Sequence, residues 1–279
     1  MPGTLYIVAT PLGNLEDITF RAVRILKEVD LIAAEDTRHS KKLLGHYGIT
    51  TPTITCHEHN EIPRAHDLIK RLENGTTIAL ISDAGTPLIS DPGYRLVSQA
   101  GEKGIPIVPV PGCNAAVTGL SASGLPTDTF LFLGFPPKKQ GRLNSFLKDA
   151  AHHKATLIFY ESPRRIIRLI SSAITAFGDR QASLARELTK QYEEIIRGPL
   201  SRILSTLDAR ETIKGECVLF IKGADEQPES LSIDQMETMI MDGLNQNMRT
   251  GELAKKIAQL ANCPKPRVYD MILALKNRS

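Results

Sequence analysis

Two carboxylates, Asp83 and Asp91, lie in a stretch of glycine, proline and small polar residues that follows the apolar run Thr77–Ile81. An apolar run that ends in glycine and proline is typical of a buried strand followed by an exposed loop, and such loops bind ligands at the carboxyl edge of open α/β sheets. Glycine lets the backbone approach a ligand, and proline fixes its path. No lysine lies between Ser82 and Tyr94, which favours a neutral or partly cationic ligand over a bare polyphosphate. The alternative is a pair of turns that only join two elements.

Polar residues follow three further apolar runs, at Glu35–Arg38, Glu161–Arg165 and Arg186–Lys190. If two domains face each other with their strand ends, these segments and Asp83 would gather around one cleft. Acids beside bases would suit a negatively charged substrate next to carboxylates that orient it or accept a proton. The alternative is a set of ion pairs that tie loops together.

The segment Cys56–Glu61 carries two histidines that would share one face of a strand, but a third metal ligand is not evident. We therefore expect no metal, and we expect substrate contact through His59, Asn60 or Glu61. The four cysteines are far apart, which argues against a disulfide framework and a cysteine zinc site. The motifs of dinucleotide-binding proteins, P-loop ATPases, zincins and serine hydrolases are absent.

Apolar runs separated by helical patterns predict a first α/β domain, residues 1–124, with a mainly parallel sheet covered on both faces. Asp17 is the predicted N-cap of its first helix, and Asn114 opens its last. We expect Thr77–Ile81 to be the central strand. The other predicted strands are Gly3–Val8, Leu31–Ala34, Pro52–Cys56 and Ile105–Val110.

A second α/β domain is predicted for residues 125–224, after a boundary near Ser123–Thr127. Its predicted strands are Phe130–Phe135, Ala155–Tyr160, Gln181–Ala185, Glu193–Ile196 and Gly215–Ile221. The last predicted segment is residues 225–279. A linker, Gly223–Ser230, leads into it, and three short helices follow and end at Arg278.

The last two predicted helices, with a break at Ala261–Pro264, have the pattern of a helix-turn-helix. Their basic residues would suit an RNA backbone. The alternative is a helical cap with its lysines in water. The RNA-binding candidates in this segment are Lys255, Lys256, Lys265 and Arg267.

A chain of 279 residues with a net charge of +3 has room for two domains and permits, but does not require, a nucleic-acid partner. The first residues lack the basic and apolar regions of a signal peptide, and no apolar run approaches membrane-spanning length. We expect a soluble cytoplasmic protein with no membrane contact.

Seven motifs, in order and across most of the chain, resemble those of the bacterial methyltransferases that act on small-subunit ribosomal RNA, in the tetrapyrrole-methylase superfamily. The motifs are TLYIVATPLGNLEDIT, AEDTR, ISDAGTPLISDPGY, PGCNAAVTGL, LFLGFPP, ESPRR and ARELTK. The resemblance implies two α/β domains that flank a cleft, S-adenosylmethionine (AdoMet) as cofactor and a homodimer. It also implies 2′-O-methylation of cytidine 1402 in 16S RNA of the small ribosomal subunit, with S-adenosylhomocysteine as second product.

By the same resemblance, AdoMet would be lined by residues of both domains. These are Pro11, Gly85, Thr86, Pro87, Ile89, Asn114, Ala115, Tyr160, Leu188 and Cys217. A loop with carboxylates and no lysine agrees with a sulfonium cofactor, which carries a positive charge and no phosphate.

Because a ribose hydroxyl is weakly acidic, the cleft should supply a base, for which Asp83, Glu161 and Glu187 are candidates. The candidates for holding phosphates in the cleft are Arg38, Arg164, Arg165, Arg186 and Lys190. Two alternatives remain: a tetrapyrrole-type methyltransferase on a small acidic molecule, and a ribosome-assembly RNA-binding protein without catalysis.

Overall fold

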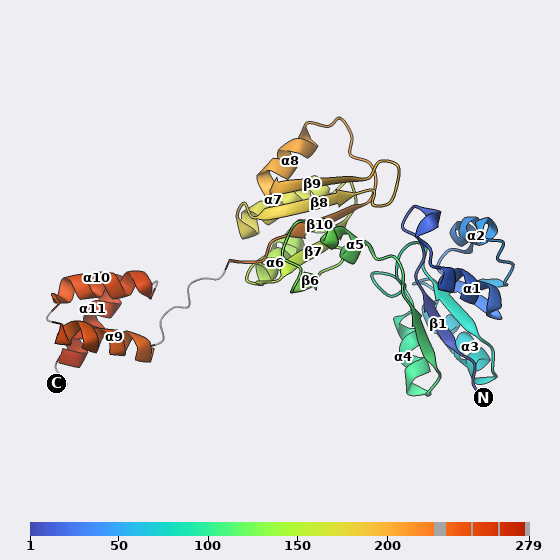
Figure 1. Cartoon of the computed structure of the whole chain (residues 1–279), viewed down its shortest axis with the longest axis horizontal. Coiled ribbons are helices and arrows are strands. Elements are labelled where there is room, and N and C mark those ends of the chain that lie inside the picture. The colour runs from blue at the N-terminus through green and yellow to red at the C-terminus, as the bar shows by residue number, and fades with distance from the viewer. Residues whose placement is uncertain (226–232, 247, 262, 277–279) are drawn as a thin grey trace. The chain divides into compact units, whose positions relative to one another are not determined.

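The computed structural model describes residues 1–225, 233–246, 248–261 and 263–276 (Figure 1). The chain divides into two compact units, Met1–Ala224 and Asp225–Ser279. The larger unit contains two five-stranded sheets, and the described residues of the smaller one form three helices. The predicted division between residues 124 and 125 lies within the larger unit and stays a prediction.

The first sheet is entirely parallel, with the order β3-β2-β4-β1-β5, so the predicted central position of β4 is confirmed. All residues of β2 and β4 are buried, as continuous apolar runs in a parallel sheet require. The strands are β1 (Leu5–Val8), β2 (Leu31–Ala34), β3 (Thr53–Thr55), β4 (Ile78–Ile81) and β5 (Ile107–Val110).

Helices cover both faces of this sheet, as predicted. They are α1 (Phe20–Glu28), α2 (Thr37–His46), α3 (Glu61–Glu73) and α4 (Tyr94–Glu102). Leu68 of α3 and Leu96 of α4 pack with Leu80 on one face. Leu26 of α1 and Leu44 of α2 pack with the opposite face. Because parallel strands end at the same edge, the loops after β1, β2 and β4 meet there.

The predicted N-cap of the first helix is wrong. Asp17 lies inside a short 3-10 helix, η1 (Leu15–Asp17), which Asn14 caps. The α-helix begins later, because the Thr19 hydroxyl accepts the Ala22 N–H at 3.1 Å. A second polar residue two positions downstream therefore takes the capping role.

The second sheet is mixed, with the order β6-β7-β10-β8-β9. β6 pairs with β7 in parallel, and the other neighbours are antiparallel. Its strands are β6 (Phe130–Phe132), β7 (Thr156–Glu161), β8 (Gln181–Arg186), β9 (Glu194–Pro199) and β10 (Cys217–Ile221). Each predicted strand of this domain is present.

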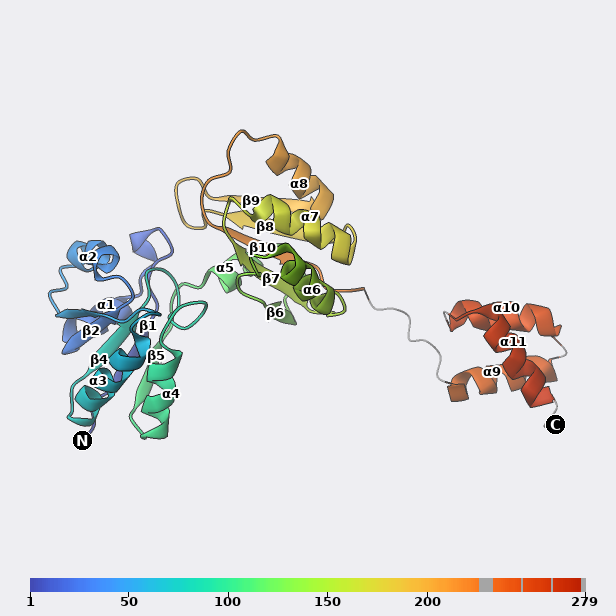
Figure 2. The same ribbon diagram turned by 180° about the vertical axis from the view of Figure 1, so that it is seen from behind.

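Helices α6 (Gln140–Ala150), α7 (Ile166–Phe177) and α8 (Leu200–Asp208) pack on one face of the second sheet (Figure 2). The helix that Asn114 opens, α5 (Ala115–Ser121), packs on the other face. The Asn114 carboxamide caps α5 by accepting the Ala116 and Val117 N–H groups. Helix α5 therefore links the edge of the first sheet to the face of the second.

Gly119 allows α5 to lie close to the second sheet, and Gly119→Ala is expected to destabilise the fold by about 1–3 kcal/mol. An added Cβ would lie 2.5 Å from Cζ of Phe220, which is fully buried and has no room to move. Urea denaturation would measure the loss. As a control, Gly141→Ala in α6 has open space at its Cβ and should raise stability slightly. Equal effects of the two substitutions would contradict this packing argument.

The smaller unit has its own apolar core, which includes Ile240, Leu253 and Val268. It consists of α9 (Ile233–Asn245), α10 (Thr250–Leu260) and α11 (Lys265–Lys276). The three predicted helices are therefore present, whereas the predicted end at Arg278 and most of the predicted linker lie outside the described residues. Among the described residues, no helix combines the length and apolar character needed to cross a membrane.

Candidate active site

The loop after β4 has an unusual backbone conformation. Gly85 and Gly93 have φ of 85° and 124°, and the non-glycine residues Leu88 and Ser90 have φ of 73° and 68°. Such conformations persist only where surrounding structure enforces them, and they gather at functional sites. Thr10 and Gly85 exchange backbone hydrogen bonds of 2.8 and 2.9 Å, which tie this loop to the one after β1.

A pocket of about 400 Å³ lies between the two sheets and is called the acidic pocket below. The Ser82–Gly93 loop and the end of β7 line the same hollow, as predicted. Its lining residues are Leu12, Glu35, Asp83, Ala84, Gly85, Thr86, Ile89, Ser90, Asp91, Asn114, Ala115, Phe135, Tyr160, Glu161, Ser162, Pro163, Glu216, Cys217 and Val218. The volume is in the range of pockets that hold small molecules.

The acidic pocket has five lining carboxylates and, among the described residues that line it, no lysine, arginine or histidine. The carboxylates are Glu35, Asp83, Asp91, Glu161 and Glu216. Burial, with the neighbouring Glu35 and Asp83 charges, raises the pKa of Asp91 to about 6, although the Ser82 hydroxyl opposes this. Burial likewise raises the pKa of Glu35, and the Asp83 N–H only partly offsets it. The pocket therefore favours a cationic ligand.

Two aromatic residues, Phe135 and Tyr160, also line the acidic pocket. Tyr160 makes edge contacts with Phe132 and Phe135, with ring centroids 4.8 and 5.6 Å apart. The Tyr160 hydroxyl accepts the Ala116 N–H at 3.1 Å, and burial raises the pKa of this hydroxyl. These rings can cover an apolar or aromatic part of a ligand.

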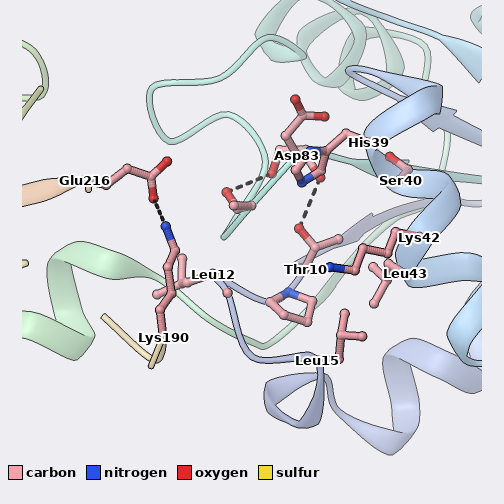
Figure 3. Close-up of a pocket in the computed structure, with 14 residues that line it drawn as sticks. Thr10, Leu12, Leu15, His39, Ser40, Lys42, Leu43, Asp83, Lys190 and Glu216 are labelled. Atoms are coloured by element: carbon pink, nitrogen blue, oxygen red, sulfur yellow. Dashed lines mark hydrogen bonds and ion pairs between the residues drawn. The ribbon is translucent and has the colours of Figure 1, made fainter. Parts of the chain in front are cut away.

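A second pocket of about 390 Å³ adjoins the first and is called the α2 pocket (Figure 3). The two pockets share Leu12, Asp83, Ala84 and Glu216. The residues of the α2 pocket are Thr10, Pro11, Leu12, Gly13, Leu15, His39, Ser40, Lys42, Leu43, Ser82, Asp83, Ala84, Lys190 and Glu216. Two ligands bound in these pockets would meet beside Asp83.

Eight of the ten predicted cofactor residues line one of the pockets. Pro11 lines the α2 pocket. Seven line the acidic pocket: Gly85, Thr86, Ile89, Asn114, Ala115, Tyr160 and Cys217. Pro87 lies buried within the loop, and Leu188 packs in the core beneath α5, so neither lines a pocket. Burial raises the pKa of the Cys217 thiol to about 12, so it stays protonated at neutral pH.

The three candidate bases differ in surroundings. Asp83 lines both pockets, and its carboxylate accepts the Asp36 N–H at 3.1 Å. Glu161 lines the acidic pocket but is ion-paired with Arg165 at 2.5 Å. Glu187 lines neither pocket.

The surroundings of Glu187 hold it in the ionised form. Its carboxylate accepts from the Lys190 ammonium at 2.9 Å and from the Glu216 N–H at 3.0 Å. Burial alone would raise its pKa, but these hydrogen bonds and the nearby positive charges outweigh burial and lower it. A carboxylate that is this well stabilised is a weak proton acceptor.

Most of the predicted phosphate-binding residues of the cleft are engaged in ion pairs. Arg38 pairs with Asp36 at 2.8 Å, and Arg186 pairs with Glu194 at 3.1 Å. Lys190 pairs with Glu187 and Glu216, and Arg165 with Glu161. Arg164 is exposed. In the smaller unit, the exposed predicted cations are Lys255, Lys256, Lys265 and Arg267.

The segment that follows β3 has a structural role. A Glu61 oxygen accepts the Gly93 and Arg95 N–H groups at 3.1 and 3.0 Å, at the start of α4, and Asn60 accepts the His57 N–H at 2.8 Å. His59, Asn60 and Glu61 line neither pocket, so the predicted substrate contact through them is not supported. In the part of the chain that the structure describes, no three His, Cys, Asp or Glu residues are placed to hold a metal.

Sequence reasoning missed several lining residues. Lys42 lies four residues beyond the motif AEDTR and is not among the predicted site residues, whereas Glu35 belongs to the predicted cleft segment Glu35–Arg38. Asp91 lies in the predicted ligand-binding loop, but the sequence predicts no role for it. Glu216 precedes an antiparallel strand, so the rule that ligands gather at strand carboxyl ends does not find it.

Comparisons with known proteins agree on the family to which this chain is similar. The family model for tetrapyrrole (corrin/porphyrin) methylases matches residues 4–204. A protein of Halalkalibacterium halodurans named "Ribosomal RNA small subunit methyltransferase I" is 49% identical over 96% of this chain and 94% of its own. A protein of Pseudomonas aeruginosa with the same name is 44% identical over 99% of both chains.

Solved structures show the same fold. The crystal structure of the methyltransferase CobJ matches with a TM-score of 0.60 and covers 80% of this chain and 95% of its own. Its identity to this chain is 19%, so the likeness concerns the fold alone.

Proposed function

The chain belongs to the tetrapyrrole (corrin/porphyrin) methylase family, and on that premise we propose that it methylates RNA of the small ribosomal subunit with AdoMet as the donor. Near-full-length relatives that are 43–49% identical are named small-subunit ribosomal RNA methyltransferases. The observation that carries the proposal is the acidic pocket between two sheets, next to a second pocket for an acceptor.

The residues of the acidic pocket fit AdoMet. Its carboxylates complement a sulfonium and an ammonium, and its aromatic residues Phe135 and Tyr160 can cover an adenine. The backbone would supply much of the cofactor binding at Gly85, Thr86 and Ala115, because these residues line the pocket and have small side chains. Bound AdoMet supplies an electrophilic methyl carbon.

Asp83 is proposed as the base, because it is the one candidate that lines both pockets. It would accept the proton that a ribose 2′-hydroxyl loses as the oxygen is methylated. The two pockets would hold donor and acceptor together, which supplies much of the acceleration. The proposed acceptor is cytidine 1402 of 16S RNA.

A transfer assay with radiolabelled AdoMet tests the proposal. The full chain should label intact small subunits or 16S RNA, and RNA from cells that lack the protein should lack one ribose methyl at cytidine 1402. Transfer to a corrin or porphyrin precursor, with none to RNA, would favour the small-molecule alternative. Binding to RNA without any transfer would favour the non-catalytic alternative.

This activity would place the protein in the cytoplasm, where small ribosomal subunits are. We also propose the homodimer that the family resemblance implies. Light scattering of the purified chain tests the dimer.

A further inference from the structure

Helix α2 contributes to the α2 pocket a pair of basic residues that the proposed function does not use. His39 and Lys42 lie one turn apart, so both reach the same side of the helix. In Figure 3 the Lys42 side chain extends from α2 toward Thr10, across the pocket from Lys190. We propose that the α2 pocket binds the acceptor nucleotide and that Lys42 holds a phosphate of its strand; this inference rests on the proposed RNA methylation.

The two lysines that line the α2 pocket differ in their ion pairs. Lys190, the other lysine of this pocket, is neutralised by Glu187 at 2.9 Å and Glu216 at 3.0 Å. Its aliphatic chain packs directly over Gly13, where an added Cβ would collide with it. Lys42 forms no ion pair with any described residue, and it is exposed. A free ammonium at the pocket rim can bind phosphate without first breaking an ion pair.

A phosphate bound at Lys42 would orient the ribose toward the residues that the two pockets share. Asp83 is one of these residues, and Lys42 lies on the side of the α2 pocket that α2 forms. A nucleotide anchored by its phosphate at α2 would extend toward Asp83, which places its sugar at the boundary with the acidic pocket. Lys42 is thus a positioning residue, and its loss should weaken acceptor use without changing cofactor binding.

The test compares Lys42→Ala with Lys41→Ala, because Lys41 is an exposed neighbour on the same helix that lines neither pocket. Methyl transfer to small subunits would be measured over a range of subunit and salt concentrations, with AdoMet affinity measured by calorimetry. We expect Lys42→Ala to lower kcat/KM for the subunit about tenfold, mainly through KM. The slope of log(kcat/KM) against log[salt] should fall by about one. Lys42→Arg should restore most of the activity.

Three outcomes would overturn the inference. Lys42→Ala and Lys41→Ala could have equal effects, or Lys42→Ala could weaken AdoMet binding as much as acceptor use. In either case the proposed methylation would still stand if the wild-type chain transfers methyl to RNA. A wild-type chain that transfers no methyl to RNA would instead remove both the proposed function and this inference.

Discussion

Asp83→Asn is expected to lower kcat for methyl transfer by about 10²- to 10⁴-fold. AdoMet affinity should fall far less than kcat, because the substitution removes only one of the five carboxylates of the acidic pocket. Asparagine has nearly the same shape and keeps an oxygen that can accept the Asp36 N–H, which Asp83 holds at 3.1 Å. It cannot take a proton from a hydroxyl. The loss should therefore appear in chemistry, measured in single-turnover reactions with saturating AdoMet and small subunits.

Glu187→Gln and Glu161→Gln are the controls for Asp83. Glu187 lines neither pocket, so its replacement should reduce kcat less than about tenfold. Glu161 is held by Arg165, so its replacement should act mainly on stability, because it leaves the Arg165 guanidinium without an opposite charge beside it. A hundredfold loss of kcat in Glu161→Gln, with Asp83→Asn almost fully active, would identify Glu161 as the base instead.

The sequence predicted the strands well because each strand is a local feature. Continuous apolar runs such as Ile78–Ile81 are buried on both faces, and glycine or proline ends them within a few residues. Capping was harder to predict, since Asp17 and Thr19 are both capable N-caps and only the additional turn of η1 decides between them.

The candidate site could be predicted only in part because ion pairing depends on register. Arg186 and Glu194 are directly opposite each other on antiparallel β8 and β9, and the sequence does not contain that pairing. Several predicted phosphate ligands are therefore engaged with carboxylates. The sequence does not predict a role for Lys42, because Lys42 lies inside helix α2 and the rule used here finds ligand-binding residues only where strands end.

Asp91→Asn is expected to weaken AdoMet binding about 10- to 100-fold at pH 7.5, which corresponds to about 1.4–2.8 kcal/mol. Asp91 lines the acidic pocket near Glu35 and Asp83, so removing its charge reduces the attraction for a cationic ligand. Titration calorimetry would measure the affinity. The exposed Asp234→Asn in α9 changes net charge equally and should leave the affinity unchanged.

The wild-type affinity should also depend on pH. The pKa of Asp91 in the free protein is about 6, so AdoMet should bind more weakly as the pH falls through 6, and binding should release a proton near that pH. The affinity of Asp91→Asn should vary much less over the same interval. A wild-type affinity that stays constant between pH 8 and pH 5 would contradict the proposed role of Asp91.

Asp91→Asn should stabilise the free protein, although it weakens AdoMet binding. Because the folded-state pKa of Asp91 is raised above 3.8, the folded protein binds this proton more tightly than the unfolded chain. Its stability therefore falls as the pH rises from about 4 to 6, and the penalty, at most about 3 kcal/mol, persists above pH 6. Asp91→Asn should then raise the melting temperature of the free protein at pH 7.5 and leave it unchanged near pH 4. If Asp91 only supported the loop, its substitution would lower both the stability of the protein and its affinity for AdoMet. A variant that is more stable but binds AdoMet more weakly would instead show that the Asp91 charge serves ligand binding at the expense of stability.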